Sequence, residues 1–199
     1  MLFRLFFVML MLLTAVACQP SGNKNKTVLT AESARQDSLV QAYVAARDSA
    51  NVVWNTMEKQ EEDMFFNMRR LLDEIRYTDN YNEAELDSLY KLVETLKNYR
   101  FTQESIKNDR VIDRYDSATQ ATTDAVLLFA ETHPQFNDYP LMGQLVDEIL
   151  EARNQVLFRR IRYDEQTIMQ NELLEEHERL SGIDSLDARK KPLFQISAE

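Results

Sequence analysis

Glycine and proline are scarce in this sequence, with 3 glycines and 4 prolines in 199 residues. Sandwiches, dinucleotide-binding folds and phosphate-binding loops need glycine for tight turns and for close approach of the backbone. The sequence contains no GxGxxG, no GxxxxGK[ST] and no GxSxG motif. These absences argue against glycine-dependent folds and nucleotide sites, and they favour long helices joined by few turns.

Cysteine and histidine are also rare, with 1 cysteine and 2 histidines. A di-iron helical bundle needs a Glu-x-x-His pair on each of two helices. Ala130 stands three residues before His133, and Leu174 stands three residues before His177, so neither pair exists. With no HExxH motif either, we predict no metal site and no cofactor. We expect His133 to interact with a helix dipole and His177 to lie on a solvated face.

Basic residues are outnumbered, since 23 Lys and Arg face 33 Asp and Glu, giving a net charge of −10. An acidic surface repels phosphate backbones, so we predict no nucleic-acid partner. The charged cluster Glu58–Asp63 is expected to be a solvated face. Trp54 and the methionines recur at helical spacing, which is more typical of a packed core than of a cofactor site.

The one cysteine, Cys18, follows a short apolar segment. Arg4 provides a positive start, Leu5–Leu13 is an unbroken run of nine apolar residues, and Ala15–Ala17 are small. A membrane span needs about 20 apolar residues, so this pattern is typical of a secretory signal peptide. A cysteine directly after the cleavage position resembles the lipobox of bacterial lipoproteins, in which the thiol takes a diacylglycerol.

The lipobox resemblance implies a signal peptide over residues 1–17 and a lipid anchor on Cys18. Membrane lipid would then be a partner, and the protein would lie in the bacterial envelope facing the periplasm. The alternative is an ordinary cleavage site beside a chance cysteine. Loss of residues 1–17 removes one charge, Arg4, and changes the net charge from −10 to −11. Residues 18–29 are predicted to be a flexible linker, since Gln19–Lys26 is polar and contains Pro20 and Gly22.

Hydrophobic periodicity predicts four long helices. The first runs from an N-cap at Thr30 to about Tyr77, and Thr78–Asn82 breaks it and caps the next. The second carries Leu86–Leu96, with a weak point at Tyr99–Thr102. The third carries Ile106–Phe129 and stops before Pro134.

The fourth helix is expected to start at Pro140 and to end near Leu180, where Ser181 and Gly182 form the cap. Short connections force neighbouring helices to run antiparallel. We therefore predict an all-α fold, an elongated antiparallel up-and-down four-helix bundle over residues 30–182.

The tail, residues 183–199, is too apolar for a simple disordered end. It contains Ile183, Leu186, Leu193, Phe194 and Ile196. We expect it to fold back with Leu193 and Phe194 packed on the bundle. The competing interpretation is that Phe194 is an exposed hook for a partner.

Leu127–Phe136 reads LLFAETHPQF, and Lys191–Phe194 reads KPLF. The first segment is similar to the LLxxAExxPxL that precedes the final helix of the LemA family, and the second is similar to that family's terminal Lys/Arg-Pro-x-Phe. Arg47 and Trp54 keep the family's seven-residue interval. After Trp54, this chain can be aligned with the family in two ways. The overall length of the chain favours one alignment, and the local identity of the segment LVETLKNY favours the other.

Within Leu145–Asn171, the polar residues at the family's spacing are Asn154, Arg160, Tyr163, Asp164 and Asn171. The resemblance implies a membrane-anchored antiparallel four-helix bundle without an established reaction, and membrane proteases as a conceivable partner. The polar residues are predicted to form an interhelical hydrogen-bond network that fixes register. The alternative is a ligand groove lined by the same groups.

Two classes of function follow from the sequence. The first is a non-enzymatic, membrane-tethered envelope scaffold or partner-binding lipoprotein. The second is an envelope hydrolase or small-ligand-binding protein whose site is assembled from scattered polar residues. A filled bundle core would favour the first, and a deep polar pocket containing a histidine would favour the second.

Overall fold

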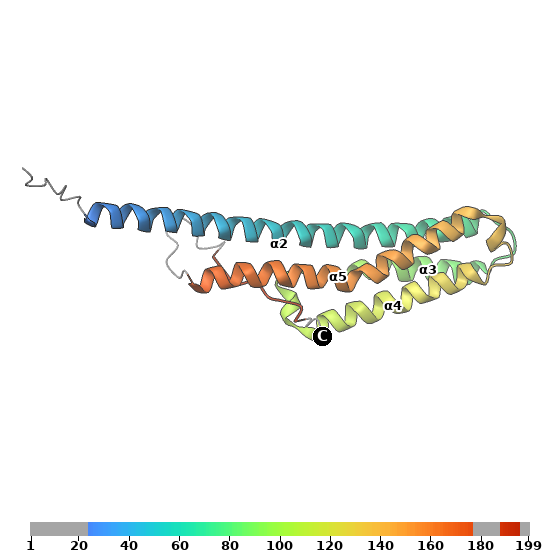
Figure 1. Ribbon diagram of the computed structural model, residues 1–199. Helices are drawn as coiled ribbons and strands as arrows, with labels where there is room; N and C mark the ends of the chain where they lie inside the picture. The colour runs from blue at the N-terminus through green and yellow to red at the C-terminus, as the bar shows by residue number, and fades with distance from the viewer. Residues whose placement is uncertain (1–23, 177–187, 196–199) are drawn as a thin grey trace, which may run out of the picture. The chain divides into compact units, whose positions relative to one another are not determined.

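The computed structural model describes residues 24–176 and 188–195 of the chain (Figure 1). Over these residues the fold is all-α and no strand is formed. The chain divides into two units, Met1–Ser38 and Leu39–Glu199, and the core lies in the second. Cys18, His177 and the expected cap at Ser181 and Gly182 lie outside the described residues.

The first described helix, α2, spans Lys24–Arg76. Its end lies within one residue of the predicted end, because Thr78–Asn82 closes it and Asn80 takes a left-handed φ of 68°. Its start is earlier than Thr30, so residues 24–29, which were predicted to belong to the linker, are helical. No glycine or proline occurs between Gly22 and Pro134, and extending an existing helix by one residue is far easier than starting a new one.

Helix α3 spans Glu83–Leu96, and its N-cap is Asn82, as the sequence predicts. The Asn82 side chain accepts a hydrogen bond of 3.2 Å from the Glu85 amide, which satisfies one of the free donors of the first turn. After α3 the chain makes a 3₁₀ turn, Lys97–Tyr99, at the predicted weak point.

Helix α4 spans Asp109–Glu131. The sequence prediction placed Ile106 in this helix, but Ile106 belongs to a separate 3₁₀ turn, Ser105–Lys107. The reason is Asn108, whose side chain accepts from the Arg110 amide and caps α4 there.

Helix α5 spans Pro140–Glu176 and follows a 3₁₀ turn at Phe136–Asp138. The predicted start at Pro140 is confirmed, since proline at the first helical position removes an amide that would have no partner. None of the described helices combines the length and apolar character needed to cross a bilayer.

Buried apolar side chains from all four helices form one core within the second unit. Trp54 and four of the methionines belong to it, whereas Met169 is exposed. Not every large apolar side chain of the predicted second and third helices is buried, since Leu92 and Leu128 are 45% and 62% exposed. The most buried core residues include Met68, Leu71, Leu72, Ile75, Leu86, Met142, Leu145 and Ile149.

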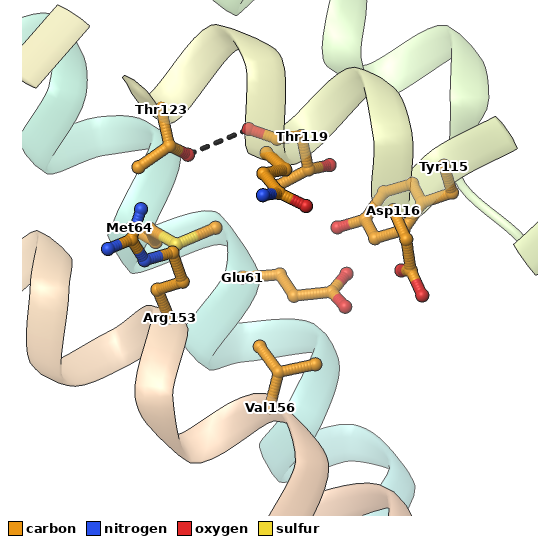
Figure 2. Close-up of a pocket in the computed structure, with 9 residues that line it drawn as sticks. Glu61, Met64, Tyr115, Asp116, Thr119, Thr123, Arg153 and Val156 are labelled. Atoms are coloured by element: carbon orange, nitrogen blue, oxygen red, sulfur yellow. Dashed lines mark hydrogen bonds between the residues drawn. The ribbon is translucent and has the colours of Figure 1, made fainter. Parts of the chain in front are cut away.

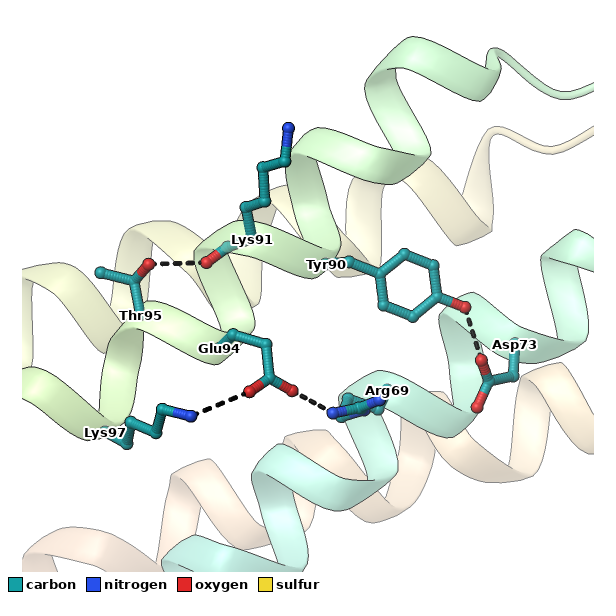
Figure 3. Close-up of polar contacts among 7 residues, drawn as sticks. All are labelled: Arg69, Asp73, Tyr90, Lys91, Glu94, Thr95 and Lys97. Carbon is teal, nitrogen blue, oxygen red and sulfur yellow. Dashed lines mark hydrogen bonds and ion pairs between the residues drawn. The ribbon is translucent and has the colours of Figure 1, made fainter.

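Polar contacts join the surfaces of α2 and α3 (Figure 3). Tyr90 donates a hydrogen bond of 2.5 Å to Asp73, and Glu94 pairs with both Arg69 and Lys97. Partial burial, together with the bond to the Asp73 carboxylate, raises the pKa of Tyr90. These pairs are exposed, so they add little stability beyond the apolar contact beneath them.

Candidate functional site

The described part of the tail, residues 188–195, lies against α5 through Phe194. The Phe194 ring is 8% exposed, and its centroid lies 5.6 Å from those of Phe101 and Tyr163 and 6.2 Å from that of Trp54. The rings of Phe101 and Tyr163 meet it edge to face, and the Trp54 ring stacks with it. Such aromatic pairs stabilise by about 0.5–1.5 kcal/mol beyond their area burial. Phe194 is therefore part of the core and not an exposed hook.

The main chain of the tail is held by polar side chains of α5. The Asp164 carboxylate accepts from the Phe194 amide at 2.8 Å. The Asn171 amide group donates to the Lys191 carbonyl at 2.8 Å and accepts from the Lys191 amide at 2.9 Å. Tyr163 adds a longer bond of 3.4 Å to the Pro192 carbonyl. Because these contacts are to backbone atoms, they fix the path of the tail and not only its apolar anchor.

Arg160, also on α5, links this arrangement to Asp116 on α4. Its two terminal nitrogens donate to the two carboxylate oxygens of Asp116 at 2.7 and 2.6 Å, and its guanidinium lies over the rings of Phe101 and Phe194. The Arg160 side chain is 7% exposed and that of Asp116 is 45% exposed. Burial lowers the pKa of Arg160, but the hydrogen bonds and charge of Asp116 outweigh this effect and raise it. We call Arg160, Tyr163, Asp164 and Asn171, with the bound segment Lys191–Phe194, the tail site.

Four of the five polar residues singled out by the family resemblance thus meet at the tail site, and Asn154 does not. Asn154 is exposed and lies about two to five turns of α5 before the others. Sequence reasoning missed Asp116 and Asn51, the latter of which accepts from the Lys191 ammonium at 2.5 Å. No signal in the sequence pairs Asp116 with Arg160 or Asn51 with Lys191, because the partners lie 44 and 140 positions apart.

A pocket lies beside the tail site, between α2, α4 and α5 (Figure 2). Its cavity measures about 240 Å³. Glu61 and Met64 come from α2, Arg153 and Val156 from α5, and the α4 residues that line it are Tyr115, Asp116, Thr119, Gln120 and Thr123. We call this the Glu61 pocket.

The prediction that Glu58–Asp63 is wholly a solvated face is wrong for Glu61. Glu58, Lys59, Glu62 and Asp63 are exposed, but Glu61 is 7% exposed and directs its carboxylate toward the Tyr115 hydroxyl (Figure 2). The helix period explains this, because Glu61 lies four residues after Met57 and three before Met64 and so shares their buried face. Burial raises the pKa of Glu61, and the Tyr115 hydroxyl and Arg160 offset only part of that effect.

Several polar atoms around the Glu61 pocket have no hydrogen-bond partner among the described residues. They are one carboxylate oxygen of Glu61, the Tyr115 hydroxyl and the Thr119 hydroxyl. The Tyr115 hydroxyl lies near enough to Glu61 to lower its pKa, but no hydrogen bond of ordinary geometry joins the two. Burial and the neighbouring Glu61 charge also raise the pKa of Tyr115, so its phenol stays protonated. Native proteins leave few buried polar groups unpaired, so three such atoms around one cavity indicate a candidate ligand site.

His133, the histidine in the described part of the chain, is buried just after the end of α4. Its Nδ1 accepts from the Gln135 amide at 3.2 Å, and its Nε2 lies 3.0 Å from the Thr78 hydroxyl. The Thr78 hydroxyl donates to the Ile75 carbonyl at 2.6 Å, so Nε2 must be the donor to Thr78. The Nε2 bond therefore holds the turn after α2 against the end of α4, and the Nδ1 bond holds the loop that follows α4.

Among the described residues, no three His, Cys, Asp or Glu side chains gather in a way that could hold a metal ion. Comparison of the chain with protein-family models, with curated proteins and with solved structures finds no match. Nothing positive in these comparisons indicates an enzyme activity.

Proposed function

We propose that this chain is a non-enzymatic, lipid-anchored protein of the bacterial envelope that binds a protein partner and is similar to the LemA family. The anchor would be Cys18, acylated after removal of residues 1–17. The tail site supports the family resemblance, because Tyr163, Asp164 and Asn171 at the family's spacing contact Lys191–Phe194, the segment similar to the family's terminal element.

We further propose that the four helices of this protein form an antiparallel up-and-down bundle. The connections support this arrangement: residues 77–82 join α2 to α3, and residues 132–139 join α4 to α5. Chains this short allow a helix to pack beside its predecessor only when it reverses direction.

The observation that carries the partner-binding proposal is an apolar stripe on α5. Leu157, Phe158, Ile168 and Met169 are 52%, 63%, 43% and 51% exposed. The pairs 157/168 and 158/169 are each eleven residues apart, which is close to three helical turns, so they share one side of the helix. Scattered apolar residues on a surface are ordinary, but four large apolar side chains exposed along one helix favour an interaction surface.

Site-specific photo-cross-linking in intact cells tests this proposal. A photoreactive phenylalanine at position 158 should give a discrete adduct, whereas the same residue at Tyr77, which is 80% exposed and lies outside the stripe, should not. Leu157→Asp together with Met169→Asp should abolish the adduct without lowering the melting temperature. Equal adducts from positions 158 and 77, or an adduct that survives both aspartates, would contradict it.

Cys18→Ala tests the anchor separately. The variant should lose its acyl chains and leave the membrane fraction, and mass spectrometry of the wild-type N-terminus should show a modified cysteine. A free thiol on Cys18 of the mature wild-type protein, or an intact Met1, would rule out the lipoprotein proposal.

A second candidate function, small-ligand binding, is favoured by the Glu61 pocket and its unpaired polar atoms. The hydrolase form of this candidate has less support, because both nitrogens of His133 are held in structural hydrogen bonds.

A further inference from the structure

We propose that the Glu61 pocket binds a small organic cation, with an ammonium group against the Glu61 carboxylate and a short apolar body against Met64 and Val156. This inference does not rest on the proposed envelope partner, because the pocket and the apolar stripe involve different residues.

The unpaired polar atoms define where the charged end of the ligand lies. One oxygen of Glu61, the Tyr115 hydroxyl and the Thr119 hydroxyl are buried without a hydrogen-bond partner among residues 24–176 and 188–195, and all three belong to residues that line the same cavity (Figure 2). An ammonium group has three donors and no acceptor. It can therefore donate to the Glu61 carboxylate and to both hydroxyl oxygens at once, which satisfies three groups that the described part of the chain leaves without a partner.

The charges around the cavity select a cation. Arg160 is paired with Asp116, and Arg153 is paired with Asp124 at 2.7 Å, so these two arginines are already neutralised. Asp116 and Arg153 are therefore each bonded to a residue of opposite charge. Glu61 is the third charged residue that lines the cavity, and none of the described residues forms an ion pair with it.

Two further arginines face Glu61 from outside the pocket lining. Arg100 pairs with Glu62 at 2.9 Å, which neutralises it. Arg159 lies near both Glu61 and Glu151, and burial lowers its pKa. Neither side chain lines the cavity, so neither occupies the position proposed for the ligand.

The apolar residues that line the cavity determine which uncharged part of the ligand fits there. Met64 and Val156 present apolar surface, and the methionine side chain adapts to irregular shapes. A cavity of about 240 Å³ accommodates an alkyl chain of a few carbons in addition to the ammonium group. A bare metal cation would leave this apolar surface unused.

Binding should be linked to proton release from Glu61. The protonated acid cannot pair with a cation, and burial favours the protonated form in the free protein. Affinity should therefore rise with pH through the raised pKa of Glu61. The groups that set this pKa are Tyr115 and Asp116 on α4, Arg160 on α5, and Arg100 in the connection before α4.

Three probes of similar size but different charge test the proposal. Butylammonium, 1-butanol and butyrate are titrated into the full chain at several pH values, and the methyl signals of Met64 and Val156 are followed by NMR. Butylammonium should shift both signals with an affinity at least about tenfold higher than that of the alcohol, since a tenfold ratio needs only about 1.4 kcal/mol. Butyrate should leave them unchanged. Equal binding of the alcohol, preferential binding of butyrate, or no shift with any probe would overturn the inference.

Two variants locate the charge that is recognised. Glu61→Gln should weaken butylammonium binding at least about tenfold and remove its pH dependence. Glu58→Gln, which removes the same charge from an exposed position one turn earlier, should change neither. Thr119→Val removes an unpaired hydroxyl without changing the shape of the side chain, so it should keep the fold and weaken binding about threefold. Unchanged affinity in both Glu61→Gln and Thr119→Val would contradict the site, even if the cross-link at position 158 forms as expected.

Discussion

The tail site and the Glu61 pocket are neighbours, yet their polar groups differ in how far they are satisfied. In the tail site, Asp164 and Asn171 are bonded to backbone atoms of Lys191–Phe194. In the Glu61 pocket, three buried polar atoms have no partner in the described chain. Arg160 lies at the border, because its partner Asp116 lines the pocket while its guanidinium lies over Phe194, and its Nε also has no partner among the described residues.

This contrast separates stability from function in the molecule. A satisfied buried polar network fixes one structure, whereas an unsatisfied buried group costs about 1–3 kcal/mol until something pairs with it. The tail site is therefore expected to hold the fold together, and the Glu61 pocket to be the place where a ligand adds stability. Substitutions in the two regions should therefore change the free energy of unfolding by different amounts, and these changes should depend differently on pH and on added ligand.

Phe194→Ala should produce the largest loss. Removal of a buried phenylalanine costs about 3 kcal/mol, and each kcal/mol lowers the melting temperature of a chain of this size by about 2–4 °C. A fall of about 6–12 °C is expected in thermal unfolding followed by circular dichroism. Phe158→Ala is the matched control, because Phe158 is 63% exposed and should change little. Similar effects of the two substitutions would remove the distinction between the tail site and the surface.

Asp116→Ala should have the next largest effect. It leaves the Arg160 guanidinium, which is 7% exposed, without its bidentate partner. Breaking a fully buried pair costs about 3–5 kcal/mol, and the 45% exposure of Asp116 reduces the expected loss to about 2 kcal/mol. Asp124→Ala breaks the more exposed pair with Arg153 and should cost less than about 1 kcal/mol in urea unfolding. Equal losses would mean that Arg160 is better solvated than its burial indicates.

Asp164→Ala tests the backbone contact of the tail alone. The substitution leaves the buried Phe194 amide without an acceptor, which should cost about 1.5 kcal/mol. Asn154→Ala is the control, since Asn154 has the family-like spacing but is exposed. In a double-mutant cycle, Asp164→Ala should cost much less once Phe194 is already alanine, because the tail is then loosened. Additive losses would show that the amide bond and the ring act independently.

The sequence predicts the fold well where it depends on local signals. The helix starts at Asn82 and Pro140 and the break at Thr78–Asn82 follow from capping, proline geometry and periodicity. The misplacement of Ile106 has the same kind of cause, since the Asn108 cap was not recognised.

The candidate sites are predicted less well, because their contacts join distant segments. Family-like spacing singles out Arg160 and Asp164, yet it also includes exposed Asn154 and gives no hint of Asp116. Glu61 shares a helical face with Met57 and Met64, so periodicity does contain the signal for its burial. That signal is hidden by its charged neighbours, which are solvated.

The smallest effect, and the one that most sharply separates the two regions, is the pH dependence of Glu61. Burial raises its pKa above the ordinary value of 4.5, so the folded protein holds this proton at pH values where the unfolded chain has released it. Stability then falls as pH rises from about 4.5 through the raised pKa, and above that pKa the cost stays constant. Glu61→Gln should remove this fall, so its stability relative to wild type, measured by urea unfolding, should increase across the same range. Asp164→Ala should not remove this fall, because that variant keeps the buried Glu61 carboxylate. A butylammonium ion bound in the pocket should also reduce the fall in the wild-type protein, since it compensates the ionised carboxylate. A pH-independent difference between wild type and Glu61→Gln would show that the carboxylate is hydrated in the folded state and that the two regions do not differ in this way.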